Sequence, residues 1–244
     1  MSTRNNLREA EPAFVLHSYP YRETSLIVEV FSLNHGRVAL LAKGAKRPHS
    51  AVRGLLMPFF PLELSWSGKN ELKTLHKAEW QGAMTGLKGE AMMCGFYLNE
   101  LLLRLLPRED AHPELYTHYL QALAELAQGK PVAPVLRRFE KRLLQQLGYA
   151  LLLQHEAGSQ HPIRSEQVYQ YDVEQGALPP GTVASSGQKR VELHGKTLLD
   201  LGQEDFSDSR TLQQCKTLMR AVLAFHLGEQ PLHTRQLLVD LQQL

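Results

Sequence analysis

Two short stretches contain residue types that bind phosphate or metals or carry out hydrolysis. Gly195-Lys196-Thr197 matches the end of a phosphate-binding loop, but the glycine needed five positions earlier is Arg190. His155-Glu156 matches the start of a helical zinc-protease motif, yet His161 follows at six residues rather than four. A metal held by these two histidines and the glutamate stays open beside the simpler reading as exposed loop side chains. We therefore expect no catalytic residues, no metal and no cofactor.

Positive charge is concentrated in residues 43–77, where seven Lys and Arg residues stand against Glu63 and Glu71, a local net charge of +5. The whole chain carries +2, so the remainder is weakly acidic. A basic stretch on an acidic remainder is typical of a surface that binds a polyanion such as nucleic acid. An ordinary solvated face is the alternative.

Aromatic residues accompany this basic stretch. Tyr19 and Tyr21 share one face of a predicted strand beside Arg22, where they either stack on bases or simply lie at the surface. Trp66 follows an apolar alternation and is expected in the core. The residues that we expect to contact DNA are Arg22, Arg37, Lys43, Lys46, Arg47, Arg53, Lys73, Lys77, Tyr19 and Tyr21.

Strands must position these residues. Between residues 13 and 80 the pattern has the period of strands in five segments: AFVLHSY, SLIVEVFSL, GRVALLA, PLELSW and ELKTLHKAEW. Asn34-His35-Gly36 predicts a hairpin connection. Five short strands with a long basic link between the third and fourth fit an OB-type barrel, with an SH3-like barrel as the alternative.

The remaining chain is mainly helical. Helices are predicted over residues 91–106, from Pro113 to Gly129, over residues 135–147 with Gly148 as cap, and over residues 212–227 with Asp208 or Ser209 as N-cap. Shorter helices are predicted at residues 197–201 and after Thr234. The fold class is therefore α+β, with an OB-fold barrel (residues 1–81), a helical bundle (residues 82–149 plus 196–244) and an irregular insertion (residues 150–195) that contains the strand-like YQYDV.

The helix over residues 135–147 has a carboxylate within its apolar stripe. Glu140 lies among leucines, and a buried charge needs a partner, for which Arg104 is a candidate. Arg137 and Lys141 border the same stripe beside Leu144. A cation at the edge of an apolar groove suits capture of a peptide with apolar side chains and a carboxylate, and solvated edge residues are the alternative.

Composition narrows the class of protein. With 244 residues, 43% of them hydrophobic and 21% charged, the sequence is that of a globular protein of one or two domains. The N-terminus lacks the apolar core of a signal peptide, and no apolar run reaches the roughly 18 residues of a membrane span. Cys94 and Cys215 are expected to be free core thiols. We expect a cytoplasmic, nucleoid-associated protein.

A resemblance to a known family runs along nearly the whole chain in the same order. FVLHSYPYRETSLIVEVFSLNHGRVALLAKGAKRPHS, GLLMPFFPLEL and ELKTLHKAEW resemble the N-terminal OB barrel of the bacterial RecO recombination mediators. YLNELLLRLLPRED, VLRRFEKRLLQQLGY and FHLGEQPLHTRQLL resemble that family's helical portion. The resemblance implies a non-enzymatic repair protein that binds single- and double-stranded DNA and anneals complementary strands.

The resemblance also implies partners. Members of the family engage the acidic C-terminal tail of single-stranded-DNA-binding protein (SSB) and, with RecR, help load RecA onto SSB-coated DNA. The family's arginine in LRRFE matches Arg137, so Arg137, Lys141 and Leu144 are the expected tail-binding residues. Many relatives carry two cysteine pairs for zinc in the segment equivalent to residues 150–195. This chain has none there, and we predict that it binds no zinc.

Two other classes of function stay open. One is a structural adaptor whose barrel binds protein, its charge toward DNA being incidental. The other is a nuclease or other hydrolase, which is disfavoured because no cluster of Asp, Glu and His in the sequence suits Mg²⁺ or an activated water.

Overall fold

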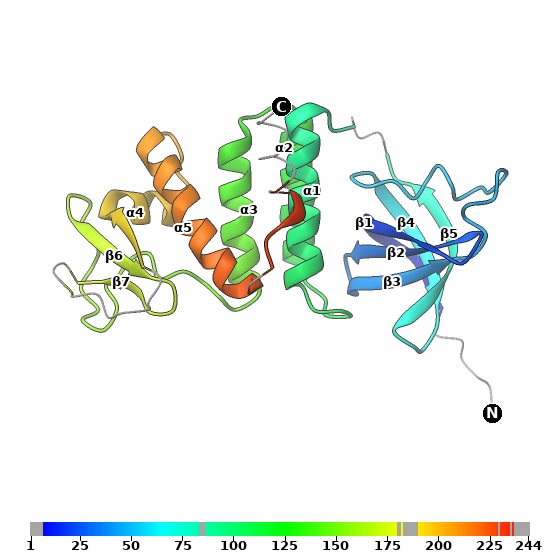
Figure 1. Cartoon of the computed structure of the whole chain (residues 1–244), viewed down its shortest axis with the longest axis horizontal. Helices are drawn as coiled ribbons and strands as arrows, with labels where there is room; N and C mark the ends of the chain where they lie inside the picture. Colours follow the sequence, from blue (N-terminus) through cyan, green and yellow to red (C-terminus); the bar gives the residue numbers. More distant parts are fainter. Residues whose placement is uncertain are drawn as a thin grey trace. The chain divides into compact units, whose positions relative to one another are not determined.

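The computed structural model describes residues 7–82, 86–179, 182, 190–228, 230–234 and 236. The chain groups into two compact units, one formed by residues 1–130 with 232–244 and the other by residues 131–231. Figure 1 labels the helices and strands of both units. The predicted division into three parts was based on changes in the sequence pattern, whereas the two units are defined by contacts between residues. The three-part division therefore stays a prediction.

The first unit begins with a closed five-stranded barrel. Its strands are β1 (Arg8–Tyr21), β2 (Ser25–Ser32), β3 (Gly36–Ala42), β4 (Pro61–Ser67) and β5 (Leu72–Trp80). They close in the order β1-β2-β3-β5-β4, and β3 and β5 form the one parallel pair. All five strands were predicted, and their order, with β1 between β2 and β4 and with β3 parallel to β5, confirms the OB-type barrel over the SH3-like alternative.

Alternating side chains of the strands fill the barrel. In β4, Leu62, Leu64 and Trp66 are each at most 1% exposed, whereas Glu63 and Ser65 between them are half-buried. The prediction that Trp66 belongs to the core is therefore confirmed.

Two helices, α1 (Gly89–Leu105) and α2 (Pro113–Ala127), belong to the same unit as the barrel. On the outer face of β1 and β2, Phe14 and Phe31 pair in register and lie against Tyr116 and Tyr119 of α2. The ring centroids in this cluster are between 5.2 and 6.1 Å apart. Because Phe14 and Phe31 are fully buried, α2 completes an apolar layer that the barrel alone leaves open.

A buried amide joins α1 to both neighbours. Asn99 donates a hydrogen bond from Nδ2 to the carbonyl oxygen of Leu16 at 2.9 Å and accepts one from the hydroxyl of Tyr119. All three residues are at most 2% exposed. Burial raises the pKa of Tyr119 far above its usual value, so its hydroxyl stays protonated and donates to the amide.

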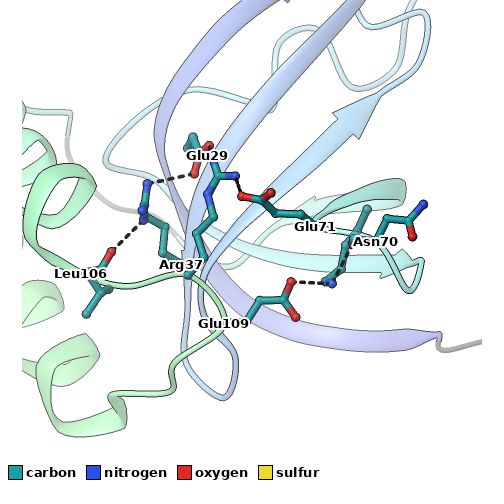
Figure 2. Close-up of polar contacts among 8 residues, drawn as sticks. Glu29, Arg37, Asn70, Glu71, Leu106 and Glu109 are labelled. Carbon is teal, nitrogen blue, oxygen red and sulfur yellow. Dashed lines mark hydrogen bonds and ion pairs between the residues drawn. The ribbon is translucent and has the colours of Figure 1, made fainter.

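The connection between α1 and α2 is tied to the barrel by ion pairs (Figure 2). Glu29 of β2 is 3% exposed and lies between two guanidinium groups, those of Arg108 and Arg37. Arg108 also pairs with Glu71, and Arg37 donates from Nε to the carbonyl of Leu106 at 3.0 Å. Burial lowers the pKa of Arg37, and Glu29 acts in the opposite sense. The charge of the buried carboxylate is thus balanced jointly by Arg37 of β3 and Arg108 of the connection, and its Oε2 is within ion-pair distance of Arg37 but accepts no hydrogen bond from the described residues.

The same connection contacts the turn before β3. The amide of Glu109 donates to the carbonyl of Arg37 at 2.9 Å, and the carboxylate of Glu109 lies 2.8 Å from Nζ of Lys73. Gly36, the last residue of the predicted hairpin connection, has a φ of +63°, and a Cβ there would lie 1.8 Å from the carbonyl oxygen of Asp110. Only glycine satisfies both the backbone conformation and the close approach.

The second unit contains three helices and a small sheet. The helices are α3 (Val132–Gln146), α4 (Gly195–Gln203) and α5 (Ser209–Leu227). Gly148 follows α3 with a positive φ, as predicted, and Asp208 is the N-cap of α5, accepting a hydrogen bond from the Arg210 amide at 2.8 Å. The predicted helix after Thr234 lies largely outside the described residues.

The segment predicted to be irregular contains an antiparallel sheet. Its strands β6 (Val168–Asp172), β7 (Gly176–Leu178) and β8 (Arg190–His194) pair in the order β7-β6-β8. Only β6, the predicted YQYDV strand, was recognised from the sequence, so the prediction of an irregular segment was wrong for β7 and β8. Tyr169 and Tyr171 of β6 are at most 2% exposed, and this apolar side gives the short strands a core.

The two cysteines are in the state that the sequence predicts. Cys94 and Cys215 are free and buried, and burial raises the pKa of Cys215 to about 12, which leaves its thiol protonated. Within the described part of the chain, every helix is too short or too polar to traverse a bilayer.

Candidate nucleic-acid interface

The strand order brings two basic connections to the same end of the barrel. β1 and β2 are joined there by residues 22–24, and β3 ends beside the start of β2, since Leu26 pairs with Ala42. The link over residues 43–60 leaves from this point and returns to β4, whose first residues pair with the last residues of β5. The 22–24 turn, the 43–60 link and the end of β5 therefore meet at one barrel end.

The 43–60 link is an ordered segment. Its backbone amides close successive turns, from Arg47 to Gly44 at 3.0 Å, from Ser50 to Arg47 at 3.1 Å and from Arg53 to Ser50 at 3.2 Å. Ala45 and Leu56 are buried in the barrel core cluster, and Val52 and Leu55 pack against it. The amide of Lys46 donates to the carbonyl of Thr24 at 2.8 Å, which fastens the link to the neighbouring turn.

Five cations lie on these two connections, and we call them the basic rim: Arg22, Lys43, Lys46, Arg47 and Arg53. All five are exposed. Across residues 7–82, 86–179 and the later described positions, none of them pairs with a carboxylate. Arg22 lies over the ring of Tyr21, 5.2 Å from its centroid. The positive charge of the rim therefore faces solvent and is not neutralised by carboxylates of the described residues.

The other predicted cations are engaged elsewhere. Lys73 is only 8% exposed and bonds Glu109, while Arg37 is half-buried beside Glu29. Lys77 is exposed, but its Nζ lies 2.9 Å from the carboxylate of Glu79. The hydrogen bond to Glu79 and the charge of Glu79 raise the pKa of Lys77. We therefore leave Arg37, Lys73 and Lys77 out of the interface.

The predicted aromatic residues are partly occupied by neighbours. Tyr19 is 46% exposed with its ring centroid 4.4 Å from that of His17, and Tyr21 is half-buried under Arg22. Sequence reasoning did not consider Trp80, the last residue of β5. Trp80 is 49% exposed at the barrel end that carries the rim, and its ring stacks on that of Phe60.

The residues predicted to bind a peptide tail lie on α3 in the second unit. Leu144 is fully buried, and Arg137 is 8% exposed with its Nη2 2.7 Å from Oε1 of Glu140, itself 0% exposed. The burial of Glu140 and its pairing with an arginine agree with the sequence, but the partner is one helical turn away on the same helix. Arg104 as a partner stays a prediction.

Breaking this pair is expected to destabilise the protein. Arg137→Ala removes a partner of a buried carboxylate, so we expect the free energy of unfolding to fall by about 3 kcal/mol. Adding Glu140→Gln to the same chain removes the charge and is expected to recover most of that loss. Urea unfolding of the two variants and of the parent measures the effect, and equal midpoints for all three would refute it.

Three further cations on α3 share one carboxylate. Arg138, Lys141 and Arg142 lie 3.4, 3.4 and 2.7 Å from the carboxylate of Glu204, the C-cap of α4. Partial burial acts to raise the pKa of Glu204, but hydrogen bonds and charge from Arg142 and Lys141 hold it below its usual value. Lys141 also donates to the carbonyl of Gly202 at 2.8 Å.

The histidine segment forms a small hairpin. The amide of Glu156 donates to the carbonyl of His161 at 2.8 Å, and the hydroxyl of Ser159 donates to the Glu156 carboxylate at 2.7 Å. His155 and His161 are exposed, with Nδ1 of His161 3.7 Å from that carboxylate. Among the residues that the structure describes, no three His, Cys, Asp or Glu side chains gather as they do around a metal.

Comparison with known proteins covers both halves of the sequence. The family described as recombination protein O N terminal matches residues 7–84, and recombination protein O C terminal matches residues 87–236. The DNA repair protein RecO of Nitrosospira multiformis is 55% identical over 244 residues, all of both chains. That of Dechloromonas aromatica is 54% identical over 245 residues, 98% of this chain and all of the relative, and that of Burkholderia pseudomallei is 51% identical over 96% and 84% of the two. The chain therefore belongs to the recombination protein O (RecO) family of DNA repair proteins.

Proposed function

We propose that this chain is a non-catalytic recombination mediator of the cytoplasm and nucleoid, which binds single- and double-stranded DNA and anneals complementary strands. The proposal includes cooperation with RecR in loading RecA onto SSB-coated DNA. The observation that supports DNA binding most directly is the basic rim, five exposed cations without carboxylate partners in the described chain. Relatives that match the chain over its whole length are named DNA repair proteins.

The proposed mechanism is electrostatic. Two complementary strands repel each other through their phosphates, and cations placed between them lower that repulsion. The 43–60 link holds Lys46, Arg47 and Arg53 on an ordered backbone, so little conformational freedom of the link is lost when DNA binds. A rim that contacts only phosphates does not distinguish sequences, which suits a protein that has to anneal any complementary pair.

For the acidic tail of SSB we propose the positive surface of α3. Arg138, Lys141 and Arg142 gather around Glu204 on this surface, and side chains of this type bind the carboxylates of a peptide. Arg137 belongs to this proposal only if a tail carboxylate replaces Glu140 as its partner. Variants of the rim are expected to spare the tail peptide, and charge-removing variants of Arg142 are expected to spare DNA.

Strand annealing by the purified full-length protein, with and without SSB, across a salt series tests the proposal. We expect annealing that weakens steeply as salt rises, because each phosphate contact releases counterions, with a slope of about −0.7 per contact on single strands. Salt-insensitive binding of a protein partner with no shift of DNA would support the adaptor instead. Cleavage of labelled DNA with Mg²⁺ or Mn²⁺ would support a nuclease.

A further inference from the structure

A large aromatic side chain is exposed where β5 ends. Trp80 keeps 49% of its surface exposed, whereas Trp66, the other tryptophan of the chain, keeps 1%. Trp80 has the parity of Ala78 and pairs with Leu62, both of which belong to the barrel core, but as the last residue of β5 it leaves half of its ring exposed at the barrel end. A half-exposed indole contributes less to the stability of the fold than a buried one. The exposed half of the ring is therefore a candidate for contact with a ligand.

The indole is held in one orientation. Its Nε1–H donates to the carbonyl oxygen of Leu55 in the 43–60 link at 3.2 Å. Its ring stacks on Phe60 with a centroid distance of 5.8 Å and an interplanar angle of 24°. One edge and one side of the ring are therefore fixed by neighbours, and the exposed remainder forms a preorganised flat apolar surface.

This surface adjoins the basic rim. Leu55, which anchors the indole, is two residues from Arg53, and the same link carries Lys46 and Arg47. The two carboxylates on β4 and β5 closest in sequence to Phe60 and Trp80 are already engaged, since Glu79 pairs with Lys77 at 2.9 Å and Glu63 accepts from Gln81 at 3.0 Å. A flat ring beside uncompensated cations matches the two halves of a nucleotide, a base and a phosphate.

We propose that Trp80, supported by Phe60, is the stacking platform for an unpaired base of a single strand whose phosphates lie on the basic rim. The proposal rests on the DNA binding proposed above and adds the substrate class that Trp80 selects. Phosphates are available in both single strands and duplexes, but the face of a base is available only where the base is unstacked. Trp80 therefore gives the rim its preference for single strands.

Affinity for an oligo(dT) single strand and for a hairpin duplex of equal phosphate number, measured by fluorescence anisotropy on full-length protein, tests the proposal. We expect Trp80→Ala to weaken single-strand binding by about 5- to 100-fold and to leave duplex binding within about twofold. Trp80→Phe retains a ring and is expected to keep most of the affinity. Tyr149→Ala is the matched control, because Tyr149 is 50% exposed and likewise stacks on a neighbouring ring, that of His226.

A second readout does not depend on removing Trp80. In a Trp66→Phe background Trp80 is the only tryptophan, and stacking of a base is expected to quench its emission with oligo(dT) but not with the duplex. Equal losses for both DNA forms in Trp80→Ala, or an unquenched Trp80 at saturating oligo(dT), would overturn the platform while leaving rim binding intact. A wild-type protein that binds neither DNA form would overturn the proposed function together with the platform.

Discussion

Reversing three charges of the basic rim is expected to weaken binding to single-stranded DNA by about 10,000-fold at low salt. Each of Lys43→Glu, Lys46→Glu and Arg47→Glu replaces an attraction of about 1 kcal/mol with a repulsion at the same place. The salt dependence should change as well, from a log–log slope of about −3.5 for five phosphate contacts to about −1.4 for two. Anisotropy titrations at a series of salt concentrations measure both quantities.

The control reverses two cations at the other end of the barrel and is compared with the rim variant per reversed charge. Arg8 pairs with Trp66, and Lys69 lies between β4 and β5, so both are far along the strands from the rim, and both are exposed. Arg8→Glu with Lys69→Glu is expected to leave the slope near that of the parent. A control that loses as much affinity per charge as the rim variant would show that net charge, and not the rim, governs binding.

The second large effect concerns the fold. Gly36→Ala is expected to lower the free energy of unfolding by about 4 kcal/mol, because the added methyl meets the carbonyl oxygen of Asp110 and the residue must hold a positive φ. The clash is with backbone, so no side-chain rotation relieves it, and the α1–α2 connection has to move away from β3. Chemical denaturation of the full-length variant measures the loss.

Gly82→Ala separates the two causes. Gly82 also has a positive φ, of +80°, but a Cβ there meets nothing within 4 Å. We expect a loss of about 1 kcal/mol, the cost of the backbone conformation alone. Equal losses for Gly36→Ala and Gly82→Ala would mean that the close approach to Asp110 contributes nothing to stability.

The barrel could be predicted because local patterns agree with it. Strand alternation around Leu62 and Leu64, glycine at the hairpin and the spacing of apolar runs each favour five strands. The β7 and β8 strands could not, because three and five residues carry too little periodicity to stand out among glycines, prolines and glutamines. Their apolar side is defined by pairing with β6, a contact that local sequence does not reveal.

The interface was predictable in part. The link cations were found from composition, because nothing in the link offers them a carboxylate. Lys73 and Arg37 are also cationic, but each forms an ion pair, with Glu109 and Glu29 respectively. Local sequence could not predict these ion pairs, because each joins residues on different elements of the fold. Trp80 was missed because it continues a strand pattern with the parity of the core, and only the structure shows that half of its ring is exposed at the end of β5.

The aromatic layer between the barrel and α2 determines where this protein can be divided. A chain cut after Gln81 would keep all five strands, yet it would expose Phe14 and Phe31 to water and leave Glu29 without Arg108. The end of the last strand is therefore not the end of the folding unit. An autonomous N-terminal fragment has to extend through α2, and a barrel expressed without it would tend to aggregate through its own uncovered wall.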